Sequence, residues 1–207
     1  MTAMNLLRRR MPLAGALLLL VLAAGNPADA GRRAAFRLPN LEGRQVSPAD
    51  FRGKVIVADF WATWCAPCFL QAEILHKAAL QYPKKDVQFL AIDVGEDEKT
   101  VRAFTAKRPF PYPVLLDEEE KVSGELKVAG FPTLLILNRK GEVSYLRAGI
   151  VPERRLRDLL AAAGAPEPAG TAAAAAQVKP VGAPPPNAAP PKPVPAAAKA
   201  SAGPSGG

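Results

Sequence analysis

Short apolar runs alternate with amphipathic stretches through the middle of the chain. Four runs have the length and the β-branched content of buried strands. They cover residues 55–60, 87–93, 133–137 and 143–148. The last two runs are joined by Asn138-Arg139-Lys140-Gly141, a connection whose length and glycine are typical of a β-hairpin.

The stretches between these runs predict helices. Residues 66–81 carry apolar side chains roughly along one helical face, and residues 98–107 have acidic residues in the first turn, where the helix dipole favours them. Residues 118–127 predict a short charged helix, and residues 152–163 predict a final helix with proline near its start. This order predicts an α/β domain with a mixed sheet and helices on both faces. Residues 36–46 would add a short N-terminal hairpin.

Residues 1–30 have the pattern of an export signal. Three arginines at 8–10 precede an uninterrupted apolar run over residues 13–24, and Ala28-Asp29-Ala30 fits a small-x-small cleavage site. Twelve helical residues span about 18 Å, well short of a bilayer core of about 30 Å. We therefore expect a cleaved signal peptide and a periplasmic or other extracytoplasmic location. An uncleaved anchor that tethers the protein to the inner membrane, and a twin-arginine signal, are the alternatives.

Composition separates the remaining chain into a domain at 31–163 and a tail at 164–207. The tail holds 15 alanines, 11 prolines and 6 glycines and has no aromatic residue, so it cannot bury enough apolar surface to offset its chain entropy. We expect a disordered Ala/Pro-rich tail, either a dispensable segment or a tether. The chain has a net charge of +8, but the domain carries 21 basic and 17 acidic residues, a net of +4. Interleaved charges of this kind argue against nucleic-acid binding.

The two cysteines are the main candidates for chemistry. Cys65 and Cys68 stand in W-C-A-P-C, immediately after a predicted strand and at the first turn of a predicted helix. Unpaired N–H groups and the positive dipole end there favour a thiolate, so we expect a lowered pKa for Cys65. A cysteine three positions on can form a reversible disulfide with it. Pro67 fits the first helical turn because its missing N–H has no partner there.

Two other interpretations of the cysteines compete with redox chemistry. Zinc needs four ligands, and His76 lies about 12 Å along the helix axis from Cys68, too far to share a metal ion. We expect no metal, and His76 is interpreted as a polar residue on the helix face. A purely structural disulfide that encloses two residues would reduce chain entropy very little. Redox chemistry is therefore the favoured interpretation.

At this point a family resemblance is clear. The segment V-I-V-A-D-F-W-A-T-W-C-A-P-C resembles the active-site strand and helix of the thioredoxin superfamily, and its F-W-A-T-W-C-x-P-C form is similar to the exported TlpA/ResA-like branch. G-F-P-T at 130–133 resembles the second signature of that superfamily. The match covers roughly residues 36–163. It implies a thioredoxin fold, a cis Pro132 that faces Cys65, and an extra helix and strand within residues 93–132.

A buried carboxylate is expected behind the dithiol. Asp59 ends an apolar strand six positions before Cys65, and burial would raise its pKa enough for it to accept the proton of Cys68. By resemblance this is the position of the buried aspartate of thioredoxin. The alternative is a strand-end aspartate that points to solvent. Relatives often carry glutamate where this chain has Gln71, so an acid–base role falls to Asp59 or, less readily, to Glu73.

The substrate surface is expected to surround the dithiol. Trp61 is interpreted as core support. Apolar groups beside a nucleophile suit an extended polypeptide, and the candidates for substrate binding are Trp64, Ala129, Phe131 and Thr133.

Together these features predict a monomeric, exported thiol-disulfide oxidoreductase with no cofactor other than a Cys65–Cys68 disulfide. Cys65 would attack a substrate disulfide, and Cys68 would resolve the mixed disulfide. The expected partners are a protein thiol or disulfide substrate, by resemblance an apocytochrome c with a C-x-x-C-H site, and a membrane electron donor. A disulfide-forming oxidase and a redox-inert binding module are the alternatives.

Overall fold

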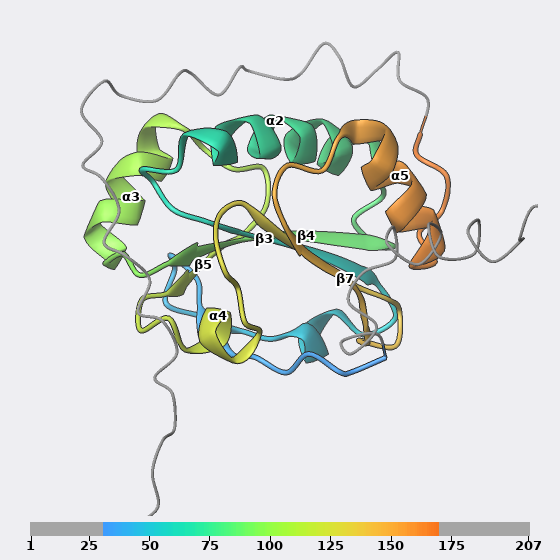
Figure 1. Ribbon diagram of the computed structural model, residues 1–207, viewed down its shortest axis with the longest axis horizontal. Helices are drawn as coiled ribbons and strands as arrows, with labels where there is room; N and C mark the ends of the chain where they lie inside the picture. Colours follow the sequence, from blue (N-terminus) through green and yellow to red (C-terminus); the bar gives the residue numbers. More distant parts are fainter. Residues whose placement is uncertain (1–30, 170–207) are drawn as a thin grey trace, which may run out of the picture.

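The centre of the domain is a five-stranded mixed sheet (Figure 1). The computed structural model describes residues 31–169, and its strands lie in the order β5-β4-β3-β6-β7. Three of them, β3, β4 and β5, run parallel, while β6 is antiparallel to both β3 and β7. Their bounds are Val55–Trp61 (β3), Val87–Val94 (β4), Val114–Asp117 (β5), Thr133–Leu137 (β6) and Val143–Ala148 (β7).

Helices cover both faces of this sheet, as the alternation of patterns predicts (Figure 1). One face carries α2 (Ala66–Gln81), α3 (Glu98–Lys107) and α5 (Glu153–Ala162). The other face carries α4 (Lys121–Glu125), the 3-10 helix η2 (Pro48–Phe51) and the small hairpin of β1 (Leu38–Pro39) and β2 (Gln45–Val46). The predicted N-terminal hairpin and the extra helix and strand, α3 and β5, are therefore present. This is the architecture of the thioredoxin fold.

One helix is shorter than its sequence predicts. The pattern over residues 118–127 predicts a helix, but α4 covers only Lys121–Glu125. The carboxylate of Asp117 accepts the backbone N–H groups of Val122 and Ser123, at 3.0 and 2.8 Å, and so fixes where the helix begins. Glu120 and Lys127 both have positive φ angles, of 56° and 57°, which a helix interior does not allow.

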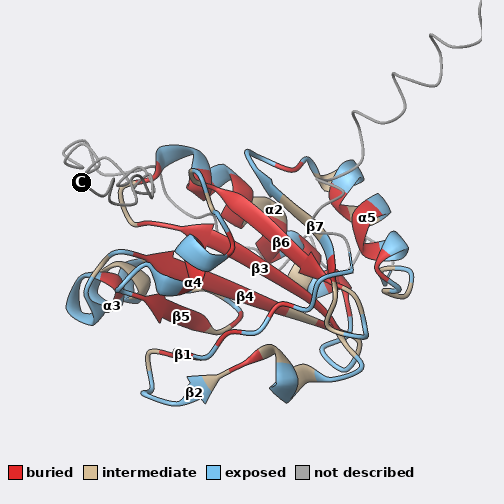
Figure 2. Ribbon diagram, turned by 60° about the horizontal axis from the view of Figure 1, so that its bottom comes forward, coloured by how far each residue is buried: buried red, intermediate tan, exposed pale blue. Residues whose placement is uncertain are grey.

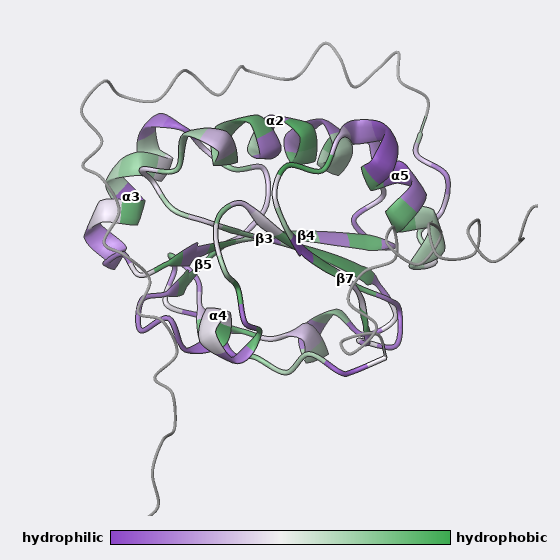
Figure 3. Ribbon diagram, viewed as in Figure 1, coloured by the Kyte–Doolittle hydropathy of each residue, from purple (hydrophilic) through white to green (hydrophobic). Residues whose placement is uncertain are grey.

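The sheet divides the core into two layers. Every residue of β3 is buried (Figure 2), and its side chains alternate between the two faces because a strand has a period of two. Val57 and Trp61 pack in the layer beneath α2, and Phe60 packs in the layer on the α4 side. Figure 3 shows the apolar strands between helices with polar outer faces. The same alternation places Asp59 on the α2 side of the sheet.

Both ends of the described segment are tied to the domain. The N–H of Gly31 donates to the carbonyl of Val143 at 3.2 Å, and the N–H of Ala169 donates to the carbonyl of Gln81 at 2.9 Å. The first six residues of the predicted tail are thus part of the described structure, and Ala165 packs against the core. The predicted signal at 1–30 and the rest of the predicted tail lie outside the described residues. Within residues 31–169, no helix has the length and apolar character needed to cross a membrane.

Candidate active site

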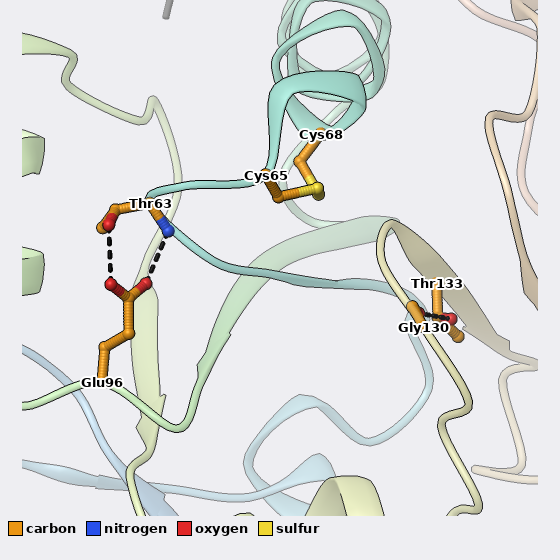
Figure 4. The surroundings of a disulfide bond; sticks show 6 residues. All are labelled: Thr63, Cys65, Cys68, Glu96, Gly130 and Thr133. Carbon is orange, nitrogen blue, oxygen red and sulfur yellow. Dashed lines mark hydrogen bonds between the residues drawn. A yellow bond between two sulfur atoms is a disulfide. The ribbon is translucent and has the colours of Figure 1, made fainter. Parts of the chain in front are cut away.

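The two cysteines lie where a parallel strand of the sheet ends and a helix begins, a common place for ligand and active sites in α/β folds. Cys65 is the N-cap residue of α2, with φ −81° and ψ 96°, and Cys68 lies in its first turn. The two sulfurs form a disulfide with an S–S distance of 2.00 Å (Figure 4). Only 3% of Cys65 and 2% of Cys68 are exposed, whereas Ala66 and Pro67 between them are exposed.

The N-terminus of α2 favours negative charge on these sulfurs when they are reduced. Neither the Cys65 side chain nor another side chain caps the helix, and proline supplies no N–H in the first turn. The remaining N–H groups of the first turn and the helix dipole therefore face the sulfurs. The lowered pKa of Cys65 remains a prediction, because the structure holds the disulfide.

A carboxylate clamps the loop that carries Cys65. Glu96 accepts the backbone N–H of Thr63 at 2.5 Å and the Thr63 hydroxyl at 2.6 Å (Figure 4). The two residues are 33 positions apart. Hydrogen bonds to a charged acceptor contribute about 1.5–3 kcal/mol, so this pair fixes the loop between β3 and α2 against the end of β4.

A second carboxyl lies buried beside this clamp. Asp93 in β4 pairs in register with Trp61 and has no exposed surface. Burial, and then the negative charge of Glu96, raise the pKa of Asp93 to about 10. Neither Asp93 oxygen faces a hydrogen-bond donor within the described part of the chain. A hydrogen bond between Asp93 and Glu96 therefore requires a proton on one of the two, and the raised pKa places that proton on Asp93.

Asp59 lies in the core on the α2 side, not in solvent. It is 1% exposed, and burial raises its pKa well above the usual range of an aspartate. Asp59 lines the same small cavity as Cys68. This location fits the expected role of a proton acceptor, which stays a prediction.

The proline loop is built as the resemblance implies. The Phe131–Pro132 peptide bond is cis, and Pro132 is buried at the start of β6. The rings of Phe131 and Trp64 lie 5.9 Å apart, centroid to centroid, so this loop lies beside the residue that precedes Cys65. Thr133 is buried, and its hydroxyl donates to the carbonyl of Gly130 at 2.6 Å (Figure 4). Whether Pro132 faces Cys65 remains an expectation.

Among the predicted substrate-binding residues, exposure differs. Trp64 and Phe131 are half-buried and Ala129 is exposed, so these three can offer apolar surface beside the dithiol. Thr133 is buried, and its hydroxyl is used within the turn. Roles in substrate binding remain predictions for all four.

An aromatic cluster supports the site from below. The ring of Trp61 lies 5.2 Å from that of Phe104 and 4.9 Å from that of Phe110, and Trp61 is 2% exposed, which agrees with its expected role as core support. The expectation for His76 is wrong: it is 7% exposed and packs against Phe110 and Tyr112. Residues 31–169 hold no group of three or more His, Cys, Asp or Glu side chains that could bind a metal ion.

Gln71 has a structural partner where relatives often carry an acid. It is fully buried, and its Oε1 accepts the backbone N–H of Val151 at 2.6 Å. This contact links α2 to the loop before α5. Glu73, two positions on, is half-buried.

Sequence reasoning missed Glu96 and Asp93. Asp93 ends a run of apolar strand residues just as Asp59 interrupts one, and it stands on the strand that pairs in parallel with β3. This repeat of an acid in an apolar strand was the available signal. Glu96 stands among the charged residues that begin α3, so its own position carries no such signal.

Comparisons with known proteins agree with this geometry. The model of the Redoxin family matches residues 23–162. Thiol-disulfide oxidoreductase ResA of Geobacillus thermodenitrificans is 30% identical over 125 residues, which cover 60% of this chain and 72% of that protein. ResA of Bacillus subtilis is 27% identical over 165 residues, which cover 74% of this chain and 92% of that protein.

Solved structures share the fold. A Chlorobium tepidum protein provisionally assigned as thiol:disulfide interchange protein DsbE superposes with a TM-score of 0.61 at 29% identity, covering 65% of this chain and 97% of its own. StoA of Bacillus subtilis has a TM-score of 0.54 at 22% identity, covering 62% and 98%. With a dithiol pair at the start of α2 and relatives that carry out disulfide exchange, the chain belongs to the Redoxin family, as a TlpA/ResA-like thiol-disulfide oxidoreductase of the thioredoxin superfamily.

Proposed function

We propose that the protein reduces disulfides of other proteins outside the cytoplasm. The observation that carries this proposal is the Cys65–Cys68 disulfide at the start of α2, with the buried Asp59 on the cavity behind Cys68. A helix N-terminus favours the thiolate of Cys65. The neighbouring apolar groups, Trp64 and Phe131, suit an extended polypeptide substrate.

Electrons and protons balance in two steps. The Cys65 thiolate attacks one sulfur of a substrate disulfide, and the other substrate sulfur leaves as a thiolate that takes a proton from water. Cys68 then loses its proton toward Asp59 and attacks the Cys65 sulfur. The bond between Cys65 and the substrate breaks, so the substrate leaves as a dithiol and the enzyme holds the disulfide.

The finer parts of the proposal concern partners and place. The export pattern at residues 1–30 supports a periplasmic or other extracytoplasmic location, either free or tethered. A monomer there would need a membrane electron donor to regenerate the dithiol. Because the two cysteines accept and donate both electrons, no other cofactor is required. An apocytochrome c with a C-x-x-C-H site is the proposed substrate.

The reduction potential tests the direction of electron flow. We expect the Cys65–Cys68 couple to equilibrate against glutathione at about −250 mV or below, in the range of thioredoxin. A value near about −120 mV, the range of DsbA, would overturn the reductase and favour an oxidase.

Trapping tests the assignment of the two cysteines. Cys68→Ser should accumulate a mixed disulfide between Cys65 and a substrate peptide, visible by mass spectrometry. Cys65→Ser should accumulate none. Full disulfide-exchange activity in both variants would contradict the mechanism, and a wild-type protein without exchange activity would support the redox-inert binding module.

A further inference from the structure

A small cavity lies between β3 and α2, directly behind Cys68. Its walls include Cys68, Asp59 and His76, together with a ring of aromatic side chains. The space open to the centre of a water molecule is about 10 Å³, close to the smallest volume that holds one water. A sulfur and two titratable side chains thus share one enclosed space, and the mechanism above uses only two of the three.

Polar atoms on and beside this cavity have no hydrogen-bond partner within residues 31–169. These atoms are Asp59 Oδ1, His76 Nε2, Trp61 Nε1 and the Tyr112 hydroxyl. Leaving a buried polar atom unpaired costs about 1–3 kcal/mol, so several together on one wall need a reason. A single water in the cavity can hydrogen-bond to two or three of them at once.

The aromatic rings hold His76 in place. Its ring meets the ring of Phe110 edge-on at 5.3 Å and that of Tyr112 at 5.4 Å. Burial lowers the pKa of His76 to about 4, so the imidazole is neutral at pH 7 and can accept a proton. Burial raises the pKa of Asp59, so that carboxyl tends to hold a proton already and, alone, is a poor acceptor.

Few charged or titratable groups face His76 from its surroundings. Asp59 comes from β3, Cys68 from α2 itself, and Arg108 and Tyr112 from the segment between α3 and β5. The guanidinium of Arg108 lies over the rings of Phe69 and Phe104, at 5.0 and 5.4 Å from their centroids. This places a fixed positive charge on the wall of the cavity, where it repels an imidazolium and favours release of its proton.

We propose that His76 is a positioning residue for the proton, which acts through Asp59 to take up the proton that Cys68 gives up when it resolves the mixed disulfide. The proton on Asp59 moves to His76 through the cavity while the Cys68 proton moves to Asp59. The Cys68 sulfur bonds to the Cys65 sulfur, and the substrate leaves as a thiolate that is protonated by water. The imidazolium then returns its proton to solvent.

The inference rests on the proposed function and is tested by the pH dependence of the second step. The reduced full-length protein is mixed with a disulfide peptide, quenched in acid at intervals, and the mixed disulfide is quantified by mass spectrometry between pH 6 and pH 9. His76→Phe, and His76→Gln as the polar variant that does not titrate in this range, should slow resolution at pH 7 by at least about 10-fold, the lower side of what a general base contributes. Their rates should recover about 10-fold per pH unit as Asp59 ionises.

Other readouts separate proton transfer from a structural effect. The rate of Cys65 attack and the reduction potential should stay at wild-type values in both variants, and Lys77→Gln, an exposed neighbour on the same helix, should match the wild type throughout. Wild-type pH profiles in both His76 variants would overturn the proton path alone. An inactive wild-type protein would overturn the proposed function and the path with it.

Discussion

Replacing Asp93 by asparagine should stabilise the oxidised protein, and more so as the pH rises. The carboxyl of Asp93 is fully buried beside Glu96, without a donor for either oxygen among residues 31–169. Asparagine has nearly the same shape, does not titrate, and can donate its amide hydrogens to the Glu96 carboxylate.

The magnitude follows from the pKa of Asp93, which rises from 3.8 to about 10 on folding. Between these values the folded protein keeps a proton that the unfolded chain releases. The free energy of unfolding therefore falls by about 1.4 kcal/mol for each pH unit above about 4. At pH 7 this amounts to about 4 kcal/mol, a large part of the 5–15 kcal/mol that is usual for a whole domain. The asparagine variant avoids this loss.

Urea unfolding of wild type and Asp93→Asn at pH 5, 6.5 and 8 measures the effect. The variant's advantage should grow by about 4 kcal/mol from pH 5 to pH 8, with an unchanged m-value. Asp117→Asn is the matched control, because the Asp117 carboxylate accepts two backbone N–H groups at the start of α4, and its loss should destabilise. An advantage of equal size at pH 5 and pH 8, or a destabilised Asp93→Asn, would refute the reasoning.

Three further predictions concern stability in urea unfolding. Leu75→Ala should cost about 2–5 kcal/mol, because Leu75 is 1% exposed on the inner face of α2; a cost below 1 kcal/mol would contradict the packing described. Glu96→Ala should cost about 1.5–3 kcal/mol at pH 5 through the lost bonds to Thr63. The loss should shrink toward pH 8, because the pKa of Asp93 falls without the Glu96 charge; a loss that grows with pH would count against it. Gly95→Ala should cost about 1–2 kcal/mol, because Gly95 has a φ of +76° that favours glycine; an unchanged midpoint would contradict this.

Local patterns in the sequence were sufficient for the elements that build the dithiol site. The bounds of α2 and α3 agree with the predicted ranges, because their apolar spacing and the positions of proline and acidic residues act within single segments. The cis Pro132 came from resemblance alone, since nothing local to Phe131-Pro132 favours the cis state.

Residues whose surroundings come from distant segments could not be predicted. The expected stripe on α2 includes Leu80, which is 40% exposed, whereas the neighbouring Ala78 and the polar His76 are buried. The contacts of α2 with the sheet and with Phe110 and Tyr112 decide this, and hydropathy along the helix does not. The bond between Glu96 and Thr63 likewise depends on β4 pairing in parallel with β3, which places residues 33 positions apart side by side.

The ties at Gly31 and Ala169 also fix how the domain can be held. Gly31 joins Val143, which lies in register with Leu137 at the end of the sheet where β3 begins, and Ala169 joins the last residue of α2. Both lie toward the right in Figure 1, while the chain enters α2 at the left. A helix of 16 residues spans about 24 Å. A bead, a surface or a fused domain joined at either end of the described segment would therefore be anchored at the pole opposite the disulfide, and the reactive sulfurs would point outward to be presented.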